Sequence, residues 1–143
     1  MPSWLLKTEP STYAYADLER DRRTRWDGVT NAQAQANLRA MRAGDRVVVY
    51  HSGSKEAVGW ARVARSAYPD PGDGTGRRVA VDVAAVDPLP RPVALSALRD
   101  EPAFAASPLL RQGRLSVVPL TAAQWKALER LARRPRRPAS LGE

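Results

Sequence analysis

The sequence contains no cysteine and a single histidine, His51. Without cysteine the chain forms no disulfide, thiolate nucleophile or cysteine-ligated metal site, and a lone histidine argues against a histidine-built metal site or triad. No apolar run approaches the roughly 20 residues of a membrane span. The opening residues "MPSWLLKTEP" lack the charged and long apolar regions of a signal peptide. We therefore expect a soluble cytoplasmic protein with no metal ion, no cofactor and no membrane partner.

Common catalytic and nucleotide-binding motifs are also missing. There is no GxGxxG, P-loop, HExxH or GxSxG sequence. The glycines of "PGDGTG", residues 71–76, lie between two strand-like runs without a following Lys-Ser/Thr pair, so they predict a hairpin loop rather than a phosphate loop. The acidic residues are scattered and nominate no carboxylate pair. The residues alone give no catalytic constellation, and we expect a protein that is not an enzyme.

Basic charge exceeds acidic charge. The chain has 23 Lys and Arg against 15 Asp and Glu, a formal net charge of +8 and a pI near 10.7. This balance favours a polyanionic partner, and nucleic acid is the first candidate. Lysine occurs only at Lys7, Lys55 and Lys126, so the arginine bias of a GC-rich genome is an alternative source of the charge.

Alternating apolar residues and β-branched runs predict the strands. They fall at residues 3–7, 45–52, 58–68, 77–86 and 114–120. The last two of the three middle strands are expected to form a hairpin around the glycine-rich loop. Pro88, Pro90 and Pro92 then predict a break in the chain.

Capping residues and helical spacing predict the helices. Ser11 or Thr12 is expected to cap a helix over residues 13–21, and Asn31 to cap a helix over residues 32–43 that Gly44 ends. Residues 94–104 predict one or two short helices. Thr121 and Gln124 fit a capping box for a last helix, whose apolar side carries Trp125, Leu128 and Leu131.

The order of these elements predicts the fold class. Strands do not alternate with long helices, which disfavours a doubly wound parallel sheet. An α+β fold built on a small, mostly antiparallel, curved sheet or barrel flanked by helices fits better. We expect one domain over residues 1–132 and a basic, disordered tail over residues 133–143, which contains "RRPRR".

The four tryptophans differ in their sequence settings. Trp125 and Trp4 share faces with leucines and are expected in the core, whereas Trp60 lies in a strand and is either exposed or covers a helix. Trp26 belongs to no periodic apolar run and directly precedes the Asp27-Gly28 turn. It is therefore either a core residue or one wall of a pocket.

A base-binding pocket needs an aromatic surface for stacking, together with donors and acceptors that read the base edge. The chain supplies these types at separated positions, namely Trp26, Asn31, Lys7, Ser52, Arg111, Gln112 and Arg114. Simpler roles are available for some of them: Asn31 as a helix cap, Ser52 as a turn residue and His51 as a core histidine. The residues alone do not show that these side chains converge.

Six blocks follow one another in an order that resembles the EVE domain family. They are "WLLKTEP", "WDGVTN", "LRAMRAGDRVVVYHS", "AYPDP", "PRPVALSAL" and "PLLRQGRLSVVPL", and the resemblance runs from about Trp4 to Trp125. It implies a PUA-like fold related to the YTH domain, which reads methylated adenine in RNA. EVE domains are thought to bind modified nucleobases, particularly modified cytosines in DNA, as readers rather than catalysts.

The resemblance also implies a site and partners. The base-binding pocket would draw on Lys7, Trp26, Asn31, His51 and Ser52, and the rim or phosphate contacts on Arg111, Gln112 and Arg114. The expected partner is nucleic acid carrying a modified base, DNA rather than RNA. Restriction or modification components are further expected partners, and the protein itself is expected to be a monomer.

The segment around Trp26 departs from the family pattern, which usually reads WDGVRNYQARNF. Thr30, Ala32, Gln35 and Ala36 replace Arg, Tyr, Arg and Asn. The resemblance therefore implies that two positive charges and an aromatic surface are lost beside the pocket, so that binding is weakened or retuned.

Two other functions stay open from the residues. One is an enzyme acting on a nucleotide or modified base, with Glu9 or Asp27 as general base. The other is an RNA-binding PUA-like module, which the positive charge would equally serve.

Overall fold

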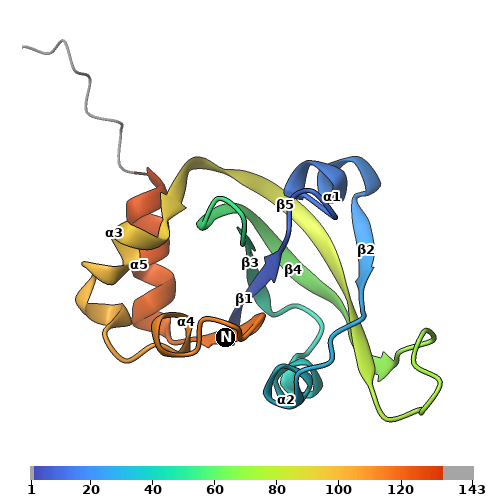
Figure 1. Ribbon diagram of the computed structural model, residues 1–143. Helices are drawn as coiled ribbons and strands as arrows, with labels where there is room; N and C mark the ends of the chain where they lie inside the picture. Colours follow the sequence, from blue (N-terminus) through green and yellow to red (C-terminus); the bar gives the residue numbers. More distant parts are fainter. Residues whose placement is uncertain (1, 134–143) are drawn as a thin grey trace, which may run out of the picture.

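Six strands form one sheet in the computed structural model, which describes residues 2–133 (Figure 1). Their order across the sheet is β2-β5-β4-β3-β1-β6. The strands are β1 (Ser3–Thr8), β2 (Arg23–Trp26), β3 (Arg46–His51), β4 (Glu56–Pro69), β5 (Val79–Ala94) and β6 (Val117–Leu120). The expected basic tail lies outside the described residues, apart from Arg133.

Only β1 and β3 run parallel; every other neighbouring pair in the sheet is antiparallel. The register between β4 and β5 shifts at four places along these two long strands. Such irregularities bend and twist a sheet, and the sheet curls around the core in Figure 1. Among the described residues no ladder joins the outer strands β2 and β6, so the sheet is barrel-like but open. The predicted α+β fold with a curved, mostly antiparallel sheet is confirmed.

Five α-helices and one 3-10 helix are formed by the described residues. They are α1 (Tyr15–Asp21), α2 (Ala32–Ala40), α3 (Leu95–Arg99), the 3-10 helix η1 (Pro102–Phe104), α4 (Pro108–Arg111) and α5 (Ala122–Arg133). Helices α3 and α5 lie on the side of the molecule opposite β2 (Figure 1). None of these helices is long and apolar enough to cross a membrane.

The core lies between the inner face of the sheet and the helices. Its fully buried side chains include Leu5, Leu6, Val48, Leu38 and Phe104. The predicted core position of Trp4 is confirmed, and its Nε1 donates a hydrogen bond of 3.0 Å to the buried Asp45. This bond satisfies the polar atom of a buried indole, as the low dielectric of a core requires.

The last helix begins as its sequence predicts. Thr121 Oγ1 accepts from the backbone N–H of Gln124 at 3.1 Å, and Gln124 Oε1 accepts from the N–H of Thr121 at 2.9 Å. This reciprocal pair is a capping box. Trp125 is buried behind it and its ring lies 4.9 Å from that of Trp60, so Trp60 covers α5.

The predicted first residue of α1 and the predicted last residue of α2 were wrong. The backbone N–H groups of Thr12 and Tyr13 both bond to the carbonyl of Glu9, so this segment forms its own turn and α1 is capped at Ala14. Helix α2 ends at Ala40 because Met41 turns to an extended conformation and is fully buried.

Two strand predictions were also wrong. Strand β2 was not expected, because Arg23–Trp26 is a short run in which charged residues alternate with others. The prolines of residues 88–92 do not break the chain but lie within β5. Strand β2 pairs only with residues 81–84 of β5, so the prolines follow where β5 has a free edge, and edge strands tolerate proline.

Candidate functional site

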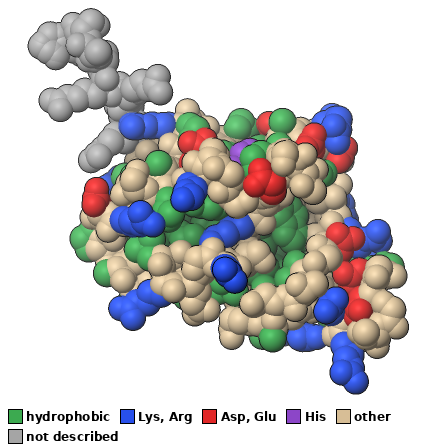
Figure 2. Space-filling model, in the orientation of Figure 1, with side chains coloured by type: hydrophobic (Ala, Val, Ile, Leu, Met, Phe, Trp, Pro, Cys, Tyr) green, Lys and Arg blue, Asp and Glu red, His purple; other side chains and the backbone are tan. Residues whose placement is uncertain are grey.

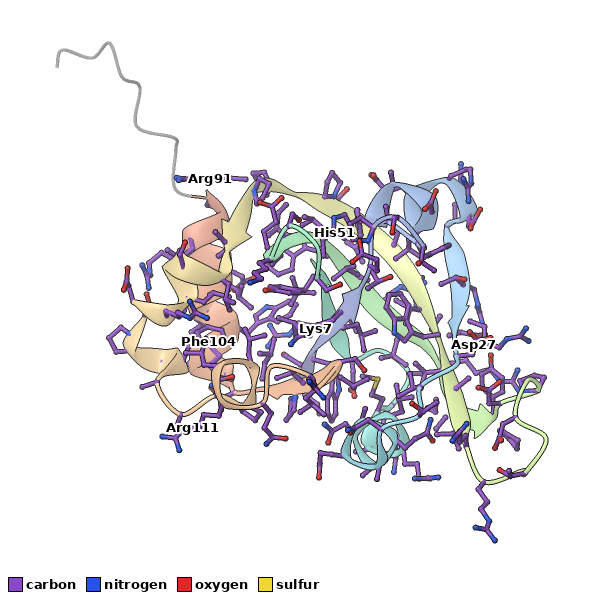
Figure 3. All side chains as sticks on the ribbon, viewed as in Figure 1. Lys7, Asp27, His51, Arg91, Phe104 and Arg111 are labelled. Atoms are coloured by element: carbon purple, nitrogen blue, oxygen red, sulfur yellow. The ribbon has the colours of Figure 1, made fainter. Side chains whose placement is uncertain are left out.

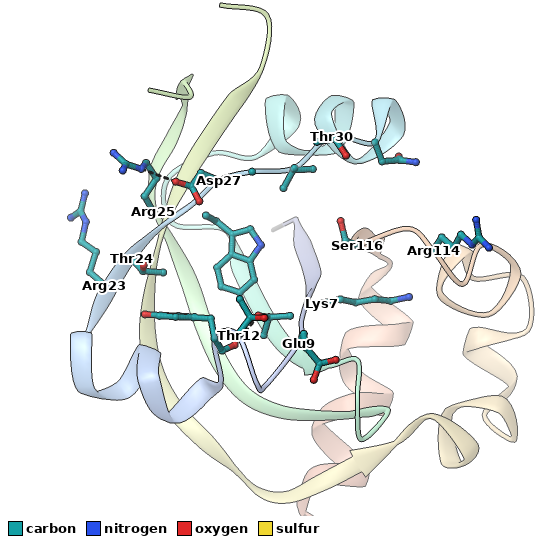
Figure 4. A pocket seen from close by; sticks show the side chains of 16 residues that line it. Lys7, Glu9, Thr12, Arg23, Thr24, Arg25, Asp27, Thr30, Arg114 and Ser116 are labelled. Atoms are coloured by element: carbon teal, nitrogen blue, oxygen red, sulfur yellow. Dashed lines mark hydrogen bonds and ion pairs between the residues drawn. The ribbon is translucent and has the colours of Figure 1, made fainter. Parts of the chain in front are cut away.

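A hollow of about 880 Å³ opens between the ends of β1 and β2 and the segment that precedes β6 (Figure 4). It is lined by Lys7, Thr8, Glu9, Thr12, Tyr13, Arg23, Thr24, Arg25, Trp26, Asp27, Gly28, Val29, Thr30, Asn31, Arg114 and Ser116. The face shown in Figure 2 is hollowed near its centre, where apolar side chains are visible between Lys and Arg side chains. The hollow therefore combines apolar surface with cationic margins.

Trp26 packs in the core and also lines the hollow. It is the last residue of β2 and pairs with the buried Val81 of β5, which leaves the tryptophan only 9% exposed. The ring of Tyr13 meets it edge to face, with centroids 6.5 Å apart and planes at 86°. Packing on Val81 and Tyr13 fixes the plane of the indole, while its remaining surface lines the hollow. The two roles left open for Trp26 are thus combined in one side chain.

The turn after Trp26 is held against the β4–β5 hairpin. Gly28 has a φ of +71°, which a residue with a side chain adopts only with strain. Its N–H donates to the buried carboxylate of Asp70 at 3.1 Å, and a second oxygen of Asp70 accepts from the N–H of Gly72 at 2.8 Å. These bonds fix one wall of the hollow.

Asn31 caps α2 while it lines the hollow. Its Oδ1 accepts from the backbone N–H of Ala34 at 2.9 Å, which confirms its predicted capping role. Within the described chain its side-chain NH₂ group makes no hydrogen bond, and the residue is exposed. Asn31 can therefore donate to a bound molecule without giving up the cap.

Lys7 ties β1 to the segment on the other side of the hollow. Its Nζ donates to the carbonyl of Gly113 at 2.9 Å, and its backbone N–H donates to the carbonyl of Ser116 at the same distance. Burial lowers the pKa of the Lys7 ammonium, because partial removal from water disfavours the charged form. The side chain points across the site in Figures 3 and 4.

The other charged groups of the hollow differ in how far they are neutralised. Arg23 pairs with Asp82 at 2.9 Å, and Arg25 pairs with Asp27 at 3.0 Å. Arg114 is exposed and has no ion-pair partner within the described part of the chain. Arg114 is thus the guanidinium most available to an anionic ligand.

Four of the eight site residues expected from sequence lie on the hollow and four do not. Lys7, Trp26, Asn31 and Arg114 come together there; His51, Ser52, Arg111 and Gln112 are not among its lining residues. Arg111 ends α4 and points outward at the edge of the molecule (Figure 3).

His51 has a structural partner instead. Its Nε2 accepts a 3.0 Å hydrogen bond from the backbone N–H of Tyr15, the first residue of α1. Burial lowers its pKa, which favours the neutral imidazole that such an acceptor requires. Ser52 lies one residue further on, where its hydroxyl is 3.4 Å from both the carbonyl of Thr8 and a carboxylate oxygen of Glu9.

Sequence reasoning missed several lining residues, above all Tyr13, Thr12 and Ser116, and it considered Glu9 only as a general base. Glu9 lies two residues beyond Lys7, so the end of β1 carries it to the same opening. Nothing in the spacing of Tyr13 shows that it meets Trp26, because that contact depends on the unexpected strand β2.

Gln35, one of the departures from the family pattern, has a structural role in the fold. Gln35 is 4% exposed and lies within the core rather than beside the hollow. Its Nε2 donates to the carbonyls of Val29 and Val79 at 2.8 and 3.1 Å, and its Oε1 accepts from the N–H of Val79 at 2.8 Å. Gln35 thus joins α2 to the turn and to β5. Of the four departures, only Thr30 lines the hollow; Ala32 and Ala36 are exposed on α2.

The open, curved sheet with a hollow at one end of its parallel strand pair defines a PUA-like domain. Residues 3–131 match the EVE domain family, and the chain belongs to that family. Chicken thymocyte nuclear protein 1 is 39% identical over 80 residues, which are 47% of this chain and 33% of that protein. The chain therefore spans about a third of the length of this relative.

Solved structures of similar proteins cover more of the chain. The NMR structure of a Rhodopseudomonas palustris protein is 41% identical, with a TM-score of 0.87 over 92% of this chain and 93% of that chain. Human THYN1 protein, solved in complex with DNA containing 5-methylcytosine, is 29% identical with a TM-score of 0.83 over 95% and 100% of the two chains.

The relation to the YTH domain is confirmed at the level of the fold. The YTH domain of a Zygosaccharomyces rouxii protein has a TM-score of 0.63 at 15% identity, over 96% of this chain and 87% of that chain. Such a low identity shows a shared fold alone.

Proposed function

We propose that the protein is a non-enzymatic reader that binds nucleic acid and accommodates one modified nucleobase, a modified cytosine in DNA, in the hollow beside Trp26. The observation that carries this proposal is the convergence of Trp26, Asn31, Lys7 and Arg114 on one opening. The human structure with DNA containing 5-methylcytosine supports it, because that protein shares the fold over nearly its whole length.

The hollow has the size and the surface that a base requires. Its volume of about 880 Å³ lies within the ~300–1,000 Å³ of typical small-molecule pockets. An indole face supplies a stacking surface worth about 1–3 kcal/mol per base. Trp26 is pre-oriented by Val81 and Tyr13, so little side-chain freedom is lost when a base stacks on it.

The polar groups around Trp26 suit the edge of a cytosine. Carboxylates accept from the exocyclic amino group of cytosine, and Glu9 and Asp27 both line the hollow. The free NH₂ of Asn31 is a donor for the ring nitrogen or carbonyl of the base. Lys7 and Arg114 add positive charge at the opposite wall, where a phosphate or an electron-rich edge would lie.

The surroundings of the carboxylates and of the histidine support binding rather than catalysis. Asp27 is exposed, and its carboxylate is engaged in an ion pair with Arg25 at 3.0 Å. Glu9 is exposed and shares its oxygens with Ser11 and Ser52 at 3.4 Å. The single histidine accepts a hydrogen bond from the backbone N–H of Tyr15 and is not among the residues that line the hollow.

Fluorescence anisotropy with labelled oligonucleotides tests the proposal. The protein should prefer an oligonucleotide with one 5-methylcytosine over the same sequence with cytosine. Trp26→Ala should weaken binding of the modified strand by about 1–3 kcal/mol, while Trp26→Phe should retain part of it. Trp60→Phe is the matched control, because Trp60 packs on Trp125 away from the hollow.

Equal affinity for both oligonucleotides, unchanged in Trp26→Phe and Trp26→Ala proteins that melt cooperatively, would refute the proposal. The same titrations with RNA strands decide between DNA and RNA. Mass spectrometry of the oligonucleotide after incubation should show no product, and any new mass would establish an enzyme instead.

A further inference from the structure

Four arginines lie on the outer face of the three strands β2, β5 and β4. The register places Arg23 of β2 opposite Ala84 of β5, and Ala84 in turn opposite Arg62 of β4. Two residues along β2, Arg25 lies opposite Asp82, and Asp82 lies opposite Arg65, which is three residues beyond Arg62 because the register of β4 shifts between Val63 and Arg65. Directly opposed residues in a sheet share a face, so the four arginines form two rows of two. We call this set, Arg23, Arg25, Arg62 and Arg65, the arginine face.

The arginine face points away from the core. The residues between these positions, Thr24, Val63 and Val83, belong to the inner face, where both valines are fully buried. All four arginines are exposed. In Figure 4 the side chains of Arg23 and Arg25 extend from β2 away from the hollow.

The arginine face retains positive charge after its ion pairs are counted. Asp82 of β5 lies between Arg25 and Arg65 and forms an ion pair with Arg23. Asp27 forms an ion pair with Arg25. Arg65 packs on the ring of Tyr68 at 3.9 Å, and Arg62 has no ion pair or hydrogen bond within residues 2–133. The two guanidinium groups on β4 form no ion pair among the described residues, and Asp82, which Arg65 faces across the sheet, is already paired with Arg23.

The spacing of the arginine face fits an extended polyanion. Arg23 and Arg25 are two residues apart on β2, a spacing of ~7 Å, and β2 and β4, as second neighbours in the sheet, are separated by ~10 Å. Arg62 and Arg65 are three residues apart, but the bulge between them keeps each opposite the same residues of β5 as Arg23 and Arg25. Four charges spread over such a rectangle do not converge on one small anion. They match successive phosphates of a nucleic-acid backbone, where guanidinium groups form charge-assisted hydrogen bonds.

The arginine face adjoins the hollow, because Arg23 and Arg25 also border it. We infer that the arginine face is a second nucleic-acid contact, which holds the phosphate backbone of the duplex that flanks the base in the hollow. This inference rests on the proposed function. It adds a sequence-independent surface that positions the duplex, while the hollow selects the base.

Salt-dependent binding to two probes tests the arginine face. One probe is a single-stranded trinucleotide with a central 5-methylcytosine, which carries only two phosphates and no flanking duplex. The other is a duplex about two helical turns long with the same modified base. Arg62→Ala/Arg65→Ala should weaken duplex binding about tenfold or more at ~0.1 M salt and reduce the slope of log K against log salt by about 2.

Trinucleotide affinity should not change in this variant. Arg99→Ala/Arg133→Ala is the matched control, because it removes two exposed arginines from α3 and α5 on the opposite side of the molecule. Arg62→Lys/Arg65→Lys keeps the charge and should keep the salt slope. Arg62→Ala alone removes no hydrogen bond, ion pair or ring contact within the described chain, so it separates binding from any folding defect caused by loss of the Arg65–Tyr68 contact.

The outcomes for the two proposals differ. Duplex affinity and salt slope that are equal in wild type and in Arg62→Ala/Arg65→Ala overturn the arginine face, even when the trinucleotide preference for 5-methylcytosine stands. Wild-type protein that does not bind the duplex also overturns it. A reduced slope without any trinucleotide preference supports the arginine face and refutes the reader function.

Discussion

The Nζ of Lys7 donates a 2.9 Å hydrogen bond to the carbonyl oxygen of Gly113, which is 106 residues later in the chain. This bond holds the segment that carries Arg114 and Ser116 against β1, together with the backbone hydrogen bond from Lys7 to the carbonyl of Ser116. Lys7 near the end of β1 therefore couples the sheet to the site through both its side chain and its backbone.

Lys7→Met should loosen this wall while it keeps the apolar stem of the side chain. Loss of one partly exposed hydrogen bond should lower the free energy of unfolding by about 0.5–1.5 kcal/mol. Amide hydrogen exchange of residues 113–116 should accelerate more than exchange in the core strands. Lys126→Met, on the exposed side of α5, is the control and should leave that segment unchanged. Equal exchange in the two variants would show that Lys7 does not hold the segment.

Gln35 should contribute to stability rather than to charge at the site. Gln35→Leu leaves the carbonyl of Val29 and the N–H and carbonyl of Val79 without their amide partner, and buried unsatisfied groups cost about 1–3 kcal/mol each. We expect the free energy of unfolding to fall by about 2–4 kcal/mol in urea titrations. Gln33→Leu, on the exposed face of the same helix, should change it by less than about 0.5 kcal/mol. Similar midpoints for both variants would contradict the role of Gln35.

Gly59 leaves room for an aromatic ring. A Cβ atom added at this position would overlap ring carbons of Tyr15, whose hydroxyl donates to the carbonyl of Trp60 at 2.6 Å. Because this ring is buried and held by its own hydrogen bond, Gly59→Ala should destabilise the protein by about 1–3 kcal/mol in thermal unfolding. Gly74→Ala meets no atom within 4 Å and serves as the control.

A second variant shows whether this contact is the cause. Gly59→Ala/Tyr15→Leu removes the overlap and should be less destabilised than the sum of the two single variants. If the destabilisation of the double variant equals the sum of the two single variants, the overlap with Tyr15 is not the reason that position 59 requires glycine.

The sequence predicted the elements whose signals are local. Thr121 and Gln124 cap α5 because both partners lie within one helical turn, and the alternation of Trp4 and Leu6 marks a strand whichever partners it finds. The resemblance of six ordered blocks to the EVE domain predicted the curved sheet. Half of the expected site residues line the hollow. Lys7 and Trp26 are among them because each lies at or near the end of a strand that borders the hollow.

Features that depend on tertiary contacts could not be predicted from local signals. His51 has the polarity of a site residue, but it accepts a hydrogen bond from the N–H of Tyr15 at the start of α1 and is not among the lining residues of the hollow. Gln35 lies on the buried side of α2, where its amide finds three backbone partners that only the folded chain brings together. Strand β2 forms because it pairs with the edge of β5. The short, charged sequence of β2 does not by itself predict a strand.

Asp73 should make the order of the β4–β5 hairpin loop dependent on acid pH. Its carboxylate accepts hydrogen bonds from the hydroxyl of Thr75 and from the backbone N–H groups of Arg78, Thr75 and Arg77, which lowers its pKa from 3.8 to about 2. A carboxyl whose pKa is lower in the folded state stabilises that state above pH ~4, and the contribution is lost as the pH falls towards 2. NMR titration should therefore show Asp73 protonating near pH 2, with the amide signals of Arg77 and Arg78 shifting in the same range. Asp73→Asn should abolish these shifts, whereas Asp100→Asn, an exposed position outside the loop, should preserve them. Protonation of Asp73 near pH 4 would contradict the capped loop, because an uncapped carboxylate gains nothing from its ionised form.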